Sequence, residues 1–202
     1  MTAVSLPPSL IPTLPGRYYT DPEIFSREQA RIFETMWFCA VRSGDLPNPG
    51  GFRSVRVGRE SVLVVRGRDG ALRAFLNICR HRGATLCTEE SGEVKRAFQC
   101  PYHAWTYGLD GKLIAAPNLT KMPDLDRVEY GLVAVHLREW LGYAWVCLAD
   151  EPPSFDQDVV GAVTERLGTA TAIDSRSPSR STTALATVDS NGAGSAARQT
   201  HT

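Results

Sequence analysis

Two short segments of this sequence bring together residue types that bind metal ions. The first reads C-R-H and the second C-P-Y-H, so each pairs one cysteine with one histidine. Cysteine thiolate is a soft ligand and neutral imidazole is a borderline one, and a mixed set of this kind favours zinc or an iron–sulfur centre. We therefore take Cys79, His81, Cys100 and His103 as the candidate metal ligands.

The spacing within the first pair bears on the kind of metal centre. In structural zinc sites both members of a pair grip one ion, usually with two or more residues between them. Only one residue separates Cys79 from His81, which makes it awkward for both side chains to reach the same ion. The spacing is natural in a Rieske [2Fe–2S] cluster, where two cysteines hold one iron and two histidines hold the other. We thus expect Cys79 and Cys100 on a buried iron and His81 and His103 on an exposed one, with a structural zinc module as the alternative.

The remaining cysteines and histidines have ordinary interpretations. Cys39, Cys87 and Cys147 lie among apolar neighbours, which is typical of core residues. His136 alternates with apolar residues in a strand-like run, and His201 lies next to the last residue. An odd number of cysteines, with no recognisable export signal, argues against a disulfide framework and predicts a reducing cytoplasmic location.

The segments "NICRHRGATLC" and "CPYHAWTYGLDG" resemble the Rieske motif of the α-subunits of ring-hydroxylating non-heme iron oxygenases. The runs "GRYYTDPEIFSREQARIFETMWFCA" and "REWLGYAWVCLADEPPSF" are similar to the helix that precedes the family's Rieske domain and to the strand that closes it. Ala104 stands where the family more often has glycine. Tyr102 follows Pro101 where respiratory Rieske proteins have a disulfide-forming cysteine, so Cys87 lacks that mate.

The resemblance implies an oxidoreductase of the mono- or dioxygenase type. Its Rieske [2Fe–2S] cluster would accept electrons from a ferredoxin or flavin reductase and pass them on for oxygen insertion. Full-length relatives hold a mononuclear Fe(II) in a second domain. That iron needs two histidines and a carboxylate, and outside the four ligands this chain offers only His136 and His201. We therefore expect no catalytic residues and a truncated chain that is inactive alone. Its expected partners are the ferredoxin or flavin reductase and, in addition, full-length α-subunits; a stand-alone Rieske electron carrier is the alternative.

Four neighbours of the ligands are candidates for tuning the cluster, namely Arg80, Arg82, Tyr102 and Trp105. Such neighbours act through hydrogen bonds and by excluding solvent. No serine follows His103 to donate a hydroxyl toward the cluster. Fewer donors stabilise the added electron less, so we expect a reduction potential near the lower end of the Rieske range, roughly −150 mV.

The elements that must position these ligands are mostly short strands. Asp21–Pro22 predicts the start of a helix that runs to about Trp37. Beyond it, short apolar runs are separated by turn signals such as Asp69–Gly70 and Asp110–Gly111. This pattern predicts a mainly β fold, a Rieske-type small antiparallel sandwich or barrel with an N-terminal helix and a disordered C-terminal tail. The expected divisions are a proline-rich arm at 1–16, a helical segment at 17–42, the Rieske domain at 43–150, the start of a linker at 151–168 and a low-complexity tail at 169–202.

Composition narrows the partners. The formal net charge is zero, which gives no support to nucleic acid or an anionic membrane as a partner. No apolar run approaches the ~20 residues that span a bilayer. The apolar fraction of 43% is ordinary for a globular domain and can support a core.

Overall fold

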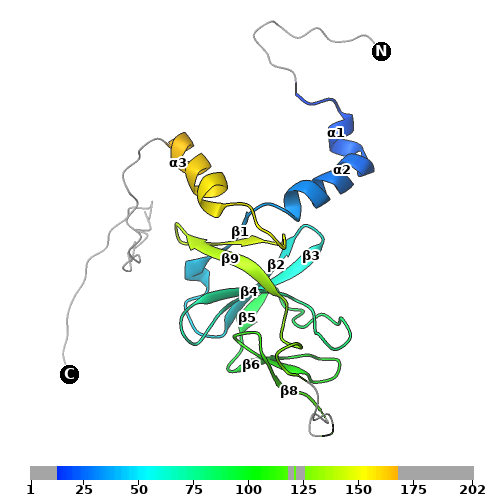
Figure 1. Cartoon of the computed structure of the whole chain (residues 1–202), viewed down its shortest axis with the longest axis vertical. Helices are drawn as coiled ribbons and strands as arrows, with labels where there is room; N and C mark the ends of the chain where they lie inside the picture. Colours follow the sequence, from blue (N-terminus) through cyan, green and yellow to red (C-terminus); the bar gives the residue numbers. More distant parts are fainter. Residues whose placement is uncertain (1–12, 118–120, 122–125, 168–202) are drawn as a thin grey trace, which may run out of the picture. The chain divides into compact units, whose positions relative to one another are not determined.

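Two antiparallel β-sheets form the body of the residues that the structure, a computed structural model, describes, namely 13–117, 121 and 126–167. The larger sheet has the order β1-β10-β9-β4-β3-β2-β5, and the smaller has the order β6-β7-β8 (Figure 1). The predicted mainly β fold is therefore confirmed. The strands of the larger sheet are β1 (Phe38–Arg42), β2 (Gly51–Val57), β3 (Glu60–Arg66), β4 (Leu72–Leu76), β5 (Ser91–Glu93), β9 (Ala134–Trp140) and β10 (Tyr143–Cys147); those of the smaller are β6 (Ala97–Gln99), β7 (Thr106–Gly108) and β8 (Leu113–Ala115).

Strand β3 is buried on both of its faces. Val62 and Val64 belong to one apolar core, and Leu63 and Val65 belong to a second, because side chains alternate between the faces of a strand. The second core also holds Phe98 and the side chains of the smaller sheet, so it lies where the two sheets meet. Cys79 and Cys100 are members of this core, which places the predicted thiolate ligands between the sheets.

The two predicted turns are confirmed. Gly70 connects β3 to β4 with a φ of 80°, and Gly111 connects β7 to β8 with a φ of 82°. This left-handed conformation favours glycine. At Gly111 a side chain would also collide with the ring of Phe75, since an added Cβ would lie 2.4 Å from that ring. Both hairpins therefore need glycine for its left-handed conformation, and the second also needs it because the Phe75 ring leaves no room for a side chain.

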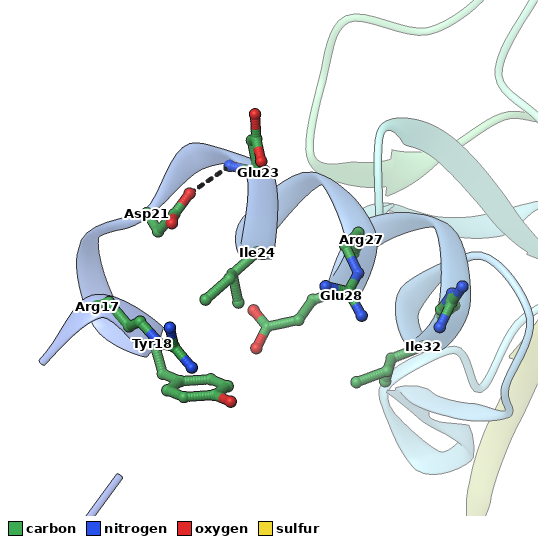
Figure 2. A pocket seen from close by; sticks show the side chains of 9 residues that line it. Arg17, Tyr18, Asp21, Glu23, Ile24, Arg27, Glu28 and Ile32 are labelled. Atoms are coloured by element: carbon green, nitrogen blue, oxygen red, sulfur yellow. Dashed lines mark hydrogen bonds between the residues drawn. The ribbon is translucent and has the colours of Figure 1, made fainter. Parts of the chain in front are cut away.

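The N-terminal helices are α1 (Arg17–Thr20), α2 (Pro22–Glu28) and the π-helix η1 (Gln29–Phe33). Asp21 caps α2 as predicted, accepting a hydrogen bond of 2.8 Å from the backbone N–H of Glu23 (Figure 2). The helix ends at Phe33 and not near Trp37. Phe25, Ile32 and Met36 are exposed, and Gln29 is buried. No helix of the described residues has the length and apolar character needed to cross a bilayer.

Two predicted boundaries need correction. Phe38–Arg42, assigned to the helical segment, forms β1 and pairs with β10, where Phe38 lies opposite Val146. The expected linker from 151 contains η4 (Asp156–Gly161) and α3 (Ala162–Leu167), because Phe155 is buried and anchors this helix. The described residues all belong to one unit, Met1–Ala172. The predicted arm falls mostly, and the predicted tail wholly, outside the described residues.

Phe155 packs against three tryptophans, one just before β1 and two in β9 and β10. Its ring centroid lies 5.1 Å from that of Trp37, 6.0 Å from Trp140 and 5.9 Å from Trp145. The indole N–H of Trp37 donates to the carbonyl of Pro153 at 2.8 Å. Aromatic contacts of this kind stabilise beyond the area that they bury, so they hold the segment after β10 onto the sheet.

Candidate metal centre

The first predicted ligand pair lies on a tight turn that follows β4. The backbone N–H of Cys79 donates to the carbonyl of Ala84 at 2.8 Å, and the N–H of Gly83 donates to the carbonyl of Cys79 at 3.0 Å. Gly83 adopts a φ of 70°, which lets the chain reverse at no steric cost. His81 lies at the middle of this turn, two residues after the cysteine.

The second pair lies on a turn of the same construction between β6 and β7. The N–H of Cys100 donates to the carbonyl of Trp105 at 2.8 Å, and the N–H of Ala104 donates to the carbonyl of Cys100 at 3.0 Å. Ala104 has a φ of 56°, at the position that corresponds to the glycine of the first turn. Each turn therefore starts at a buried cysteine and carries its histidine two or three residues further along.

The two thiols lie in apolar surroundings. Cys79 and Cys100 are 1% and 2% exposed. Burial is the main cause that raises the pKa of the Cys79 thiol; the hydroxyl of Tyr107 opposes this rise and the neighbouring Cys100 adds to it. Two thiolates cannot form side by side here without a compensating positive charge. A metal centre supplies that charge, since thiols bind metal as thiolates.

The two imidazoles also lie next to each other. The ring centroids of His81 and His103 are 4.7 Å apart, with an angle of 77° between the rings. The Nδ1 atom of His103 is buried and has no hydrogen-bond partner among the residues that the structure describes. Buried nitrogen atoms are normally satisfied, and a metal ion would satisfy this one. Burial lowers the pKa of His81, as do the charges of His103 and Arg82, and this favours the neutral form that binds metals.

Aromatic rings cover both histidines. Trp105 is buried and stacks on His81, with centroids 4.9 Å apart and the planes within 9°. Tyr102 lies over His103, with centroids 3.8 Å apart, and remains 61% exposed. Tyr130 packs edge-on against Trp105. The predicted neighbours Tyr102 and Trp105 thus contact the histidines directly, one from the solvent side and one from the core.

The two predicted arginines make weaker contributions. Arg80 and Arg82 are both exposed. The guanidinium of Arg80 reaches the carbonyl of Glu129 at 3.5 Å, and the charge of Arg82 acts on His81. The part of Arg80 that lies closest to the thiols is its backbone N–H, which donates to the hydroxyl of Tyr107 at 3.0 Å.

Tyr107 is the residue that sequence reasoning missed. It is fully buried on β7, and its hydroxyl oxygen lies 3.3 Å from the Cys79 sulfur. Burial is the main cause that raises the pKa of the Tyr107 hydroxyl, and the hydrogen bond to Cys79 raises this pKa further. The hydroxyl therefore stays protonated at neutral pH. Its oxygen also accepts from the backbone N–H of Arg80, and toward a Cys79 thiolate the hydroxyl is the donor. A tyrosine at the centre of a buried strand needs a partner for its hydroxyl, and this was the signal in the sequence.

The other predicted residues lie elsewhere. Cys87 and Cys147 are buried as expected, but Cys39 is exposed, because it points away from both cores at the edge strand β1. His136 lies on β9 with Nε2 3.2 Å from the carbonyl of Asp150. In the described part of the chain, no three His, Cys, Asp or Glu side chains converge on one point; a two-plus-two set for two irons does not require this. A hollow along α1, α2 and η1 contains none of the four ligands (Figure 2).

Comparison with known proteins identifies the domain that contains these turns. Residues 36–130 match the family model described as the Rieske [2Fe-2S] domain. The chain contains a Rieske domain. It is 41% identical over 145 residues to the glycine betaine monooxygenase oxygenase subunit of Pseudomonas aeruginosa, covering 71% of this chain and 33% of that protein. It is 37% identical over 149 residues to the carnitine monooxygenase oxygenase subunit of Escherichia coli, covering 74% and 40%.

Solved structures give the same result. The apo form of a quaternary ammonium Rieske monooxygenase superposes with a TM-score of 0.70 at 32% identity, covering 77% of this chain and 45% of that chain. A naphthalene 1,2-dioxygenase mutant bound to phenanthrene superposes with a TM-score of 0.68 at 32% identity, covering 76% and 35%. The chain is thus related to Rieske oxygenase subunits and spans about a third to two-fifths of the curated relatives named above. A [2Fe–2S] cluster is the cofactor of its Rieske domain.

Proposed function

We propose that this chain holds a Rieske [2Fe–2S] cluster through four side chains and serves as an electron-transfer module of an oxygenase. Cys79 and Cys100 hold the inner iron, and His81 and His103 hold the outer iron. The cluster supplies reversible uptake of one electron. The Rieske unit comprises the strands from β1 to β10. The protein's own residues bury the thiolates, orient the imidazoles and exclude water from one side of the site.

The pair of matching turns is the observation that carries this proposal. Both turns place a cysteine in the core and a histidine outside it, and the two histidine rings lie in contact. A site for one zinc ion would bring all four ligands to a single point. The unpaired Nδ1 of His103 adds support, because it offers a buried lone pair that the protein itself does not use.

Metal and sulfide analysis of anaerobically purified protein tests the ligand set. We expect about two irons and two acid-labile sulfides per chain, the stoichiometry of a Rieske centre. Cys79→Ser and His81→Ala should each abolish it, whereas Cys39→Ser, an exposed cysteine away from the turns, serves as the matched control and should retain it. One zinc per chain without sulfide would contradict the proposal and favour the structural zinc module.

The electron donor and acceptor follow from the relatives. We infer that a ferredoxin or flavin reductase reduces the cluster and that the electron passes to the mononuclear iron of an oxygenase domain. One solved relative is described as a quaternary ammonium Rieske monooxygenase with inter-subunit electron transfer. The glycine betaine and carnitine monooxygenases among the relatives make oxidation of a quaternary ammonium compound the reaction that we propose for the oxygenase it serves.

Complementation in trans tests this role. The glycine betaine monooxygenase oxygenase subunit, with its own Rieske cluster removed by substitution of a cluster cysteine, should regain substrate-dependent oxygen uptake when the present chain and a reductase are added. The present chain alone should take up no oxygen with substrate, because apart from the proposed ligands its sequence holds only His136 and His201. Electron uptake without any restored oxygen consumption would favour the stand-alone electron carrier.

A cytoplasmic location is also part of the proposal. Thiolate ligands and iron–sulfur clusters survive best where thiols stay reduced. All five cysteines are free thiols in the structure, which supports this expectation. Fractionation of the producing cells, with the cluster's visible absorption followed in each fraction, tests it; recovery of the protein only outside the cytoplasm would contradict it.

A further inference from the structure

The structure assigns to Asn77 the role of positioning the first ligand turn, an inference that rests on the proposed function. Asn77 directly follows β4 and lies two residues before Cys79. It is 2% exposed, and its side chain is one of the few polar ones within the core. Burying a primary amide costs free energy unless all of its hydrogen-bonding groups are paired. Its contacts therefore indicate what it does.

The side chain of Asn77 pairs with both backbone groups of Cys87. Its Oδ1 accepts from the Cys87 N–H at 2.9 Å, and its Nδ2 donates to the Cys87 carbonyl at 2.7 Å. The Asn77 carbonyl also accepts from the N–H of Leu86 at 3.3 Å. The Asn77 amide thus pairs with the backbone of Cys87 as a residue of a neighbouring strand would. These bonds join the two ends of the segment 77–87 and close it into a ring.

The same amide ties this ring to the larger sheet. Nδ2 lies 3.3 Å from the hydroxyl of Ser54 on β2 and 3.2 Å from the hydroxyl of Ser61 on β3. The backbone N–H of Asn77 donates to the carbonyl of Ser61 at 2.8 Å. The ring that carries Cys79 is therefore fixed both on itself and on two strands of the sheet.

Comparison of the two turns explains why only the first needs this device. The second turn lies between β6 and β7, which pair with each other and so hold both of its ends. The first turn leaves β4, and a single isolated bridge, between Ile78 and Thr85, pairs its two sides, since residues 88–90 after it belong to no strand. Its own hydrogen bonds, from Cys79 to Ala84 and from Gly83 to Cys79, fix its shape but not its place relative to the second turn. Asn77 does for the first turn what strand pairing does for the second.

The test compares Asn77→Ala with the matched control Arg66→Met in the iron-loaded protein. Arg66 is also a largely buried donor to loop carbonyls, those of Leu46 and Ser43, and has no contact with the ligand turns. We measure the rate at which a chelator removes iron and the electron paramagnetic resonance spectrum after reduction. We expect Asn77→Ala to release iron about 10- to 100-fold faster, the range found for residues that orient metal ligands, and to shift the spectrum, while Arg66→Met changes neither.

Equal release rates and unchanged spectra in both variants, at matched melting temperatures, would overturn the inference. Should Asn77→Ala fail to fold, the double variant Ser54→Ala/Ser61→Ala decides, since it removes the two hydroxyl anchors of the amide and keeps both the ring and the backbone bond from Asn77 to the Ser61 carbonyl. If this variant releases iron faster than the wild type, the inference is supported; if it releases iron at the wild-type rate, the inference is overturned. A wild-type protein without any [2Fe–2S] cluster would contradict the proposed function itself. This outcome differs from failure of the Asn77 inference, in which the wild type holds the cluster and the variants release iron at the wild-type rate.

Discussion

Replacing Tyr107 by phenylalanine should lower the reduction potential of the cluster. The substitution removes one buried oxygen atom and leaves the ring in the core. The hydroxyl lies 3.3 Å from the Cys79 sulfur and accepts from the backbone N–H of Arg80 at 3.0 Å. A cysteine bound to iron is a thiolate and carries no proton, so the hydroxyl is the donor in the hydrogen bond to the sulfur. The hydrogen bond favours the reduced cluster, since the sulfur carries more negative charge after the electron arrives.

The size of the effect follows from the strength of such a bond. A hydrogen bond to a charged group contributes about 1.5–3 kcal/mol. Both oxidation states keep the bond, so we assign about 1 kcal/mol to the difference between them. A tenfold change in a one-electron equilibrium corresponds to about 1.4 kcal/mol or 59 mV. We therefore expect Tyr107→Phe to lower the potential by about 40 mV.

Protein-film voltammetry of the variant and wild type at neutral pH measures this difference. Tyr130→Phe is the matched control, because the Tyr130 ring packs against Trp105 near the same core, while the described residues give its hydroxyl no hydrogen bond to a cysteine. The control should stay within a few millivolts of wild type. A potential for Tyr107→Phe that is unchanged or higher would refute the assignment of Tyr107 as a donor to the cluster, as would an equal shift in the control.

Three further predictions concern Ala104, Cys87 and the ion pair between Asp69 and Arg73. Ala104→Gly should raise the free energy of unfolding by about 0.5–1 kcal/mol in urea melts, because relief of the left-handed strain exceeds the added chain entropy; a less stable variant would contradict this. Cys87→Ser should keep its iron, since Cys87 is buried but belongs to neither turn, and loss of iron would show a ligand role. Stability should fall as pH drops below about 3.9, because Arg73 lowers the pKa of Asp69 and the resulting stabilisation is lost when Asp69 is protonated; an equal loss in Asp69→Asn, measured by urea midpoints, would argue against it.

Local sequence signals predicted much of the fold. Asp21 with Pro22 located the start of α2, and Asp69–Gly70 and Asp110–Gly111 located two hairpins, because capping and left-handed turns depend on few neighbouring residues. Long-range packing was not predictable in this way. The sequence gives no local sign that Phe38–Arg42 pairs with β10 about a hundred residues later, or that Phe155 meets three tryptophans.

For the candidate site, too, local features could be predicted from the sequence and long-range contacts could not. Ligand types and spacing were enough to propose the four ligands, because the two members of each pair lie within one turn. Tyr107 and Asn77 act across the fold, on Cys79 and Cys87 respectively, and their contacts depend on how the strands pack. The expected potential of roughly −150 mV assumed few donors. The hydroxyl of Tyr107 adds one, so we now expect a value above that limit.

Nitrogen-15 electron nuclear double resonance on the reduced protein, labelled at histidine Nδ1, tests the central claim most directly. The claim is that His81 and His103 bind the outer iron while Cys79 and Cys100 bind the inner one. The buried, unpaired Nδ1 of His103 makes this atom the expected ligand. We predict two strongly coupled nitrogen atoms in the labelled protein and one in His103→Cys. A reduced cluster with no coupled nitrogen, or a protein with no paramagnetic signal and one bound zinc, would contradict the account.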